Sequence, residues 1–86
     1  AGASVPLTSE SITLGRAASN TVVLDDEFVS SHHARIYKDP ASGQWAIEDL
    51  GSTNGTIVNG RKIKSAPLQD ADRIIIGTTE LEFQLL

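Results

Sequence analysis

The segment Thr56-Ile57-Val58-Asn59-Gly60-Arg61-Lys62-Ile63 decides the fold class of this 86-residue chain. Two short strand-like runs flank the pair Asn59-Gly60. Asn-Gly in that position is the strongest short-range signal for a β-hairpin, because both residues accept the positive φ angles of a tight turn. The segment therefore predicts two antiparallel strands joined by a two-residue turn.

A two-residue period continues outward from this hairpin. Residues 80–85 alternate polar and apolar side chains without a break, which is typical of a half-buried strand. No window of ten or more residues has the apolar period of a helix, and Pro67 interrupts the stretch that comes nearest to one. Many short strands separated by turn residues predict an all-β sandwich or barrel. The further strand candidates are Ile12–Leu14, Thr21–Leu24, Ala34–Tyr37, Trp45–Glu48 and Arg73–Ile76.

Composition excludes several function classes. The chain has 11 acidic and 7 basic residues, a net charge of −4, and only four aromatic residues, so we expect no nucleic-acid partner. It has no cysteine, and two histidines alone cannot make a structural zinc site, so no metal is expected. No apolar run approaches the ~18 residues that span a bilayer, so we expect no direct membrane insertion. The absence of cysteine suits the cytoplasm.

Three polar segments interrupt the strand pattern. In Gly15-Arg16, the glycine allows a turn that brings a guanidinium to a strand end, where it could pair with two oxygens of a phosphate or a carboxylate, or remain solvated. Ser30-Ser31-His32-His33 supplies hydroxyl groups that can donate to an anion. In the segment Asp49–Thr56, two glycines frame hydroxyl and amide side chains, without the Gly-Lys-Ser/Thr of a nucleotide-binding loop.

The two histidines allow other interpretations. Ser30 and His33 could belong to a hydrolase, but the chain has no Gly-x-Ser-x-Gly elbow and no evident acid partner. His32 and His33 could bind a metal, yet neighbours on a strand point to opposite faces. We favour a third interpretation, in which His33 is buried and its ring holds a turn by bonding a loop carbonyl.

Taken together and in this order, the motifs resemble the forkhead-associated (FHA) domain, in its bacterial form. The resemblance runs from about Leu7 to Leu86 and rests on several separated motifs: Gly15-Arg16, Asn20–Asp26, Ser30-x-x-His33 with Ala34-Arg35-Ile36, Ser52–Thr56 and Asn59-Gly60. It implies a two-sheet antiparallel β-sandwich of about eleven strands, with the first strand missing from this chain. Residues 1–86 would then be a single domain and a fragment of a longer protein.

The resemblance also implies a function. FHA domains are interaction modules without catalytic activity or cofactor, and loops at one end of the sandwich bind phosphothreonine peptides. Arg16, Ser30, Ser31 and Thr53 would contact the phosphate, and Asn54 would hold the peptide main chain. Phe28 would help to select the ligand side chain three residues after the phosphothreonine. The residues expected to shape the loops are Gly15, His33 and Gly55.

One departure from the family bears on the site. Many relatives have a basic residue where this chain has Ser31, so Arg16 is expected to supply an unusually large share of the affinity. The expected partner is a phosphothreonine protein in Ser/Thr kinase signalling, either a kinase or its substrate. The domain would work in the cytoplasm, with any membrane association arising through partners or missing segments. The alternative is a phosphate-independent scaffold domain of the same fold.

Overall fold

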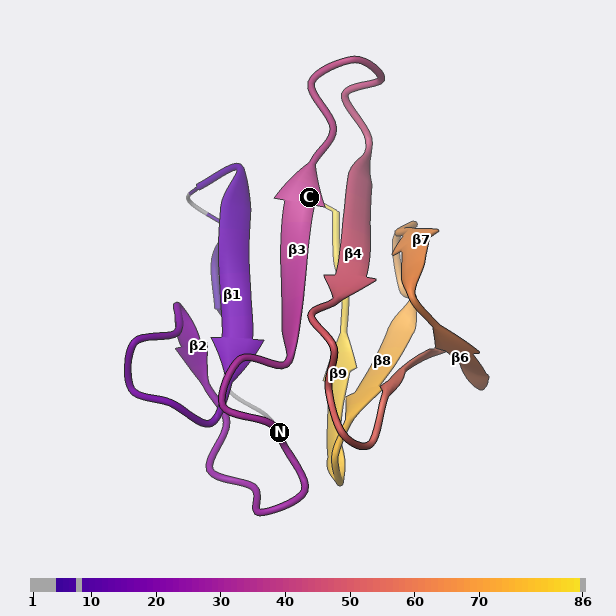
Figure 1. The fold of residues 1–86 in the computed structure, drawn as a ribbon. Helices are drawn as coiled ribbons and strands as arrows, with labels where there is room; N and C mark the ends of the chain where they lie inside the picture. Colours follow the sequence, from indigo (N-terminus) through magenta and orange to yellow (C-terminus); the bar gives the residue numbers. More distant parts are fainter. Residues whose placement is uncertain (1–4, 8, 86) are drawn as a thin grey trace.

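The computed structural model describes residues 5–7 and 9–85, which form two β-sheets packed face to face (Figure 1). One sheet has the strand order β2-β1-β3-β4-β7 and the other has the order β6-β5-β8-β9. The strands are β1 (Ser11–Gly15), β2 (Val22–Val23), β3 (Ala34–Lys38), β4 (Trp45–Asp49), β5 (Thr56–Val58), β6 (Arg61–Ile63), β7 (Ser65–Pro67), β8 (Arg73–Ile76) and β9 (Thr79–Glu82).

The predicted all-β sandwich is confirmed, with differences in detail. The described residues hold nine strands where the resemblance implied about eleven. The sandwich is not wholly antiparallel, because β1 and β2 pair in parallel, with Leu14 opposite Val22. Strand β7 was not predicted, and β9 ends at Glu82 before the alternation of residues 80–85 does. The expectation of a missing first strand concerns the start of the chain, where residues 1–4 lie outside the described residues.

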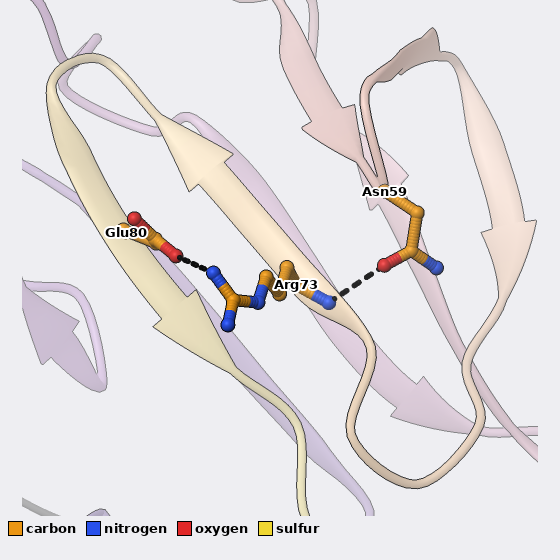
Figure 2. Close-up of polar contacts among 3 residues, drawn as sticks. All are labelled: Asn59, Arg73 and Glu80. Carbon is orange, nitrogen blue, oxygen red and sulfur yellow. Dashed lines mark hydrogen bonds and ion pairs between the residues drawn. The ribbon is translucent and has the colours of Figure 1, made fainter.

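The predicted hairpin joins β5 to β6. Val58 lies opposite Arg61, and the two turn residues have the positive φ angles that such a turn demands, 50° at Asn59 and 83° at Gly60. The Asn59 side chain anchors the turn to β8, since its Oδ1 accepts a hydrogen bond from the N–H of Arg73 at 3.0 Å (Figure 2). Its Nδ2 donates to Asp72 Oδ1 at 2.9 Å. The guanidinium of Arg73 in turn pairs with Glu80 on β9 (Figure 2).

Alternate residues of the facing strands fill the core. Ile47 of β4, with Ile74 and Ile76 of β8, is almost fully buried, as period-two patterning requires of side chains between two sheets. The rings of Trp45 and Phe83 pack at 6.1 Å between centroids near one end of the core. The remaining buried apolar residues are Ile12, Leu14, Leu24, Val29, Ala34, Ile36, Val58 and Leu68.

Strand direction brings three loops to one end of the sandwich. Strands β1 and β4 end there, and β3 and β5 begin there, so loops 16–21, 24–33 and 50–55 meet in the lower part of the view (Figure 1). We call these three loops the loop end. All the predicted site residues lie in it or at its border, at Gly15. No helix in the described residues is long and apolar enough to cross a membrane.

Candidate functional site

Backbone hydrogen bonds fix Arg16 beside the two serines. The N–H of Arg16 donates to the carbonyl of Ser30 at 3.0 Å, and the N–H of Ala17 donates to the carbonyl of Ser31 at 3.2 Å. This approach requires glycine at position 15, because a Cβ there would lie 2.3 Å from the Ser31 carbonyl oxygen. Gly15 therefore lets the first loop close against the second, and the side chains of Arg16 and Ser31 are both exposed there.

The Ser30 hydroxyl links the second loop to the third. Its Oγ accepts a hydrogen bond from the N–H of Thr53 at 3.1 Å. A serine hydroxyl can accept and donate at once, so this bond leaves the hydroxyl proton of Ser30 available to an anion. The same contact places the exposed Thr53 side chain next to Ser30. Arg16, Ser30, Ser31 and Thr53 are thus brought together, as the four residues predicted to contact phosphate.

His33 is fully buried and bridges the same two loops. Its Nε2 donates to the carbonyl of Gly55 at 2.8 Å, and its Nδ1 accepts from the N–H of Ser30 at 3.1 Å. Because the carbonyl can only accept and the N–H can only donate, these partners assign the ring proton to Nε2. Both ring nitrogens are hydrogen-bonded to backbone groups of the loops, so His33 has no free nitrogen for proton transfer or metal binding.

Asn54 and Phe28 form a second link between the loops. The Nδ2 of Asn54 donates to the Phe28 carbonyl at 2.9 Å. Asn54 is exposed, and no partner for its Oδ1 is found among the described residues. That oxygen can accept from a peptide N–H. The Phe28 ring is half exposed beside it, which is a suitable position for contact with a ligand side chain.

Asp49, at the end of β4, organises the third loop, and it was not among the predicted site residues. Its carboxylate accepts from the Ser52 and Thr56 hydroxyls and from the N–H groups of Gly51 and Ser52. Burial acts to raise the pKa of Asp49, but these hydrogen bonds outweigh burial and lower the pKa. Ser52 continues the network by accepting from the N–H of Gly55 at 2.9 Å. The Asp-x-x-Ser spacing is the signal that could have identified Asp49, because aspartate side chains often bond backbone N–H groups in turns.

Asn20 was also missed as part of the site. It is buried, and its Nδ2 donates to the carbonyls of Ala17 at 2.8 Å and Ser31 at 2.6 Å. In the sequence, Asn20 stands out only as the first residue of the motif Asn20–Asp26. Its amide ties the first loop to the backbone of the second at Ser31.

Asp26 attaches the second loop to the β8–β9 hairpin of the other sheet. Its Oδ2 accepts from the N–H and the hydroxyl of Thr78, both at 2.7 Å, and from the Thr79 hydroxyl at 2.9 Å, while Oδ1 accepts from the N–H of Phe28. These bonds, led by the Thr78 hydroxyl, lower the pKa of Asp26 from 3.8 to about 2. The Asp26 carboxylate is therefore occupied by the hairpin and by the Phe28 backbone.

The electrostatics of the loop end favour one anion at a defined place. The two ion pairs of the described residues, Arg35–Glu48 and Arg73–Glu80, leave the Arg16 guanidinium without a carboxylate partner there. Guanidinium, hydroxyl and N–H groups are the donors that phosphate oxygens prefer. Among the described residues, no cluster of three metal-ligating side chains occurs. Two shallow depressions of the described surface lie elsewhere, around the β3–β4 loop and β7.

Comparison with known proteins agrees with this geometry. The FHA domain family matches residues 12–77. The chain belongs to the FHA domain family. The FHA domain-containing protein FhaB of Mycolicibacterium smegmatis is 41% identical over 85 residues, which cover 98% of this chain and 54% of FhaB. The FHA chain therefore spans about half the length of this relative.

Solved structures agree with the fold of this FHA domain. Mycobacterium tuberculosis EmbR in complex with a low affinity phosphopeptide has a TM-score of 0.85 and 38% identity, covering 92% of this chain and 21% of the EmbR chain. A structure from a structural and functional analysis of phosphothreonine-dependent FHA domain interactions also has a TM-score of 0.85. It is 32% identical and covers 93% of this chain and 81% of that chain.

Proposed function

We propose that this FHA domain is a phosphothreonine-dependent protein interaction module in Ser/Thr kinase signalling. The observation that carries the proposal is the juxtaposition of Arg16, which is in neither ion pair of the described residues, with Ser30 and the exposed Thr53. A phosphothreonine brings a charge of roughly −1.5 to −2 and three strong acceptor oxygens, which these groups can satisfy. Ser31 would add a further donor. Asn54 would hold the peptide main chain, and Phe28 would contact a ligand side chain.

The comparisons support this assignment. EmbR, which has the same fold, has been solved with a phosphopeptide, and the second structural relative comes from work on phosphothreonine-dependent FHA interactions. We propose binding without catalysis, because both nitrogens of the buried histidine are held by backbone groups. The partner would be a Ser/Thr kinase or its substrate, since such kinases produce phosphothreonine. A chain without cysteine is suited to the cytoplasm, where we place this interaction.

Matched peptides test the proposal. Calorimetric titration would compare one peptide sequence carrying phosphothreonine, phosphoserine or threonine. We expect binding only with a phosphorylated residue, and tighter binding with phosphothreonine. Arg16→Ala removes hydrogen bonds to a charged group, each contributing about 1.5–3 kcal/mol, so affinity should fall at least about tenfold. Arg61→Ala removes the same charge at the β5–β6 turn and should leave binding unchanged.

Two results would contradict the assignment. Equal binding of all three peptides would favour the phosphate-independent scaffold instead. An Arg16→Ala variant that binds phosphothreonine peptide within about twofold of the original domain would remove Arg16 from the phosphate site. Far-ultraviolet circular dichroism of both arginine variants establishes that the fold is intact, so that a loss of binding reports on the site.

A further inference from the structure

Lys62 approaches the loop end from the neighbouring strand. It pairs with Ile57 across β5 and β6. Gly55 precedes Ile57 by two residues, so Gly55 and Lys62 are diagonal neighbours on one sheet face. A Cβ built at Gly55 would lie 2.3 Å from Cε of Lys62, 3.1 Å from Cδ and 3.2 Å from Cγ. The aliphatic stem of Lys62 therefore lies directly over the bare Cα of Gly55.

Gly55 is itself fixed within the site. Its N–H donates to Ser52 Oγ, and its carbonyl accepts from the buried ring of His33. It directly follows Asn54, whose proposed role is to hold the peptide main chain. The end of the Lys62 stem therefore lies over the residue that follows Asn54, whereas the backbone of Arg16 is bonded to Ser30 in the second loop.

The charge distribution makes this second cation significant. Arg16 is the only lysine or arginine within the three loops of the loop end, whose second loop carries Asp25, Asp26 and Glu27. Lys62 is exposed and belongs to neither of the two ion pairs of the described residues. A lysine ammonium on a flexible stem is a compact point charge that suits a single carboxylate. Arg16 and Lys62 therefore offer two cations to one peptide, at separate places.

We propose that Lys62 is a specificity-determining residue, which selects ligands with an acidic side chain close to the phosphothreonine. This inference rests on the proposed function, because it needs a bound phosphopeptide whose main chain runs past Asn54. Phosphate recognition by Arg16 would provide the affinity that all phosphothreonine peptides share. The Lys62 ammonium would add a preference for one flanking carboxylate. Because Gly55 has no side chain, the Lys62 stem can lie across it.

A Gln-to-Glu scan of the ligand tests this role. A phosphothreonine peptide with glutamine at every flanking position is changed to glutamate one position at a time, and each peptide is titrated into the domain. An exposed ion pair contributes about 0.2–1 kcal/mol, so glutamate at the favoured position should raise affinity by up to about fivefold. Lys62→Gln should abolish that gain and leave the affinity for the all-glutamine phosphopeptide unchanged.

Two variants serve as matched controls. Arg61→Gln removes an equal charge from the adjacent position of β6, whose side chain points to the other face, and should retain the glutamate gain. Lys62→Arg keeps the charge and should retain most of the gain. Added salt should reduce the gain in the original domain, because an exposed ion pair is screened.

Three results would overturn the proposal. One is a scan in which no position favours glutamate. Another is a gain that persists unchanged in Lys62→Gln. The third is an equal loss for glutamine and glutamate peptides in Lys62→Gln, which would place Lys62 on the phosphate instead. Failure of the proposed function is distinguishable from these results, because the original domain would then either not bind the all-glutamine phosphopeptide or bind its unphosphorylated form equally well.

Discussion

Asp49→Asn tests whether one carboxylate organises the third ligand loop. The change preserves the shape of the side chain and replaces one of two oxygens that each accept two hydrogen bonds. Two bonds to a charged group are lost, at about 1.5–3 kcal/mol each. Because the carboxylate is only partly buried, water recovers part of this loss, and we expect unfolding to become easier by about 2–3 kcal/mol. The melting temperature of a domain of this size should fall by about 10–20 °C.

Urea unfolding and peptide titration provide the two measurements for Asp49→Asn. Thr53 and Asn54 belong to the loop that Asp49 holds, so affinity for a phosphothreonine peptide should fall about tenfold although Asp49 has no proposed ligand contact. Asp39→Asn is the matched control, because it removes the same charge but affects one exposed bond, to the N–H of Ala41. We expect that control to change stability by less than about 0.5 kcal/mol. If the two variants unfold alike and bind alike, the reasoning about Asp49 is wrong.

Three further perturbations follow from the site. His33→Ala leaves the Ser30 N–H and the Gly55 carbonyl without their partner, at about 1–3 kcal/mol each, so chemical denaturation should show a loss of about 2–6 kcal/mol in the free energy of unfolding. Gly15→Ala should weaken phosphopeptide binding at least tenfold in titration, with the sheet retained by circular dichroism, because its Cβ would clash with the Ser31 carbonyl. The pKa of Asp26 is lowered from 3.8 to about 2, so the stability that this carboxylate contributes is present above pH 3.8 and is lost as pH falls toward 2. In Asp26→Asn, stability measured against pH should therefore change less between pH 3.8 and 2 than in the original domain. An unchanged profile would contradict this.

Local patterns predicted the strands better than the way in which they pair. Asn59-Gly60 specifies a tight turn through its own backbone preferences, and the hairpin forms as predicted. The parallel contact of Leu14 with Val22 depends on a loop that returns the chain to the same edge, which no short pattern encodes. Strand β7 was missed because Pro67 argues against regular structure. An edge strand tolerates proline, since one side of it needs no partner in the sheet.

For the site as well, some residues could be predicted from their own chemistry, and others only from the fold. Arg16, Ser30 and Thr53 stand out in the sequence because their donor groups suit phosphate, and the structure brings them together. Asp49 and Asn20 act on backbone groups that only folding brings near, such as the Ser31 carbonyl, eleven residues beyond Asn20. The position of Lys62 over Gly55 likewise depends on strand register, which cannot be read from either residue alone.

The anchoring of Asn59 has a consequence for the chemical ageing of the domain. Asparagine followed by glycine is the pair most prone to deamidation, because the glycine N–H can reach the side-chain carbonyl carbon and close a succinimide ring. Here both ends of the amide are held, Oδ1 by the N–H of Arg73 and Nδ2 by Asp72, and the residue keeps a φ of 50° (Figure 2). Ring closure must break both bonds. The folded hairpin therefore protects Asn59 from deamidation. The rate of deamidation at Asn59 should accordingly depend on how often this turn opens.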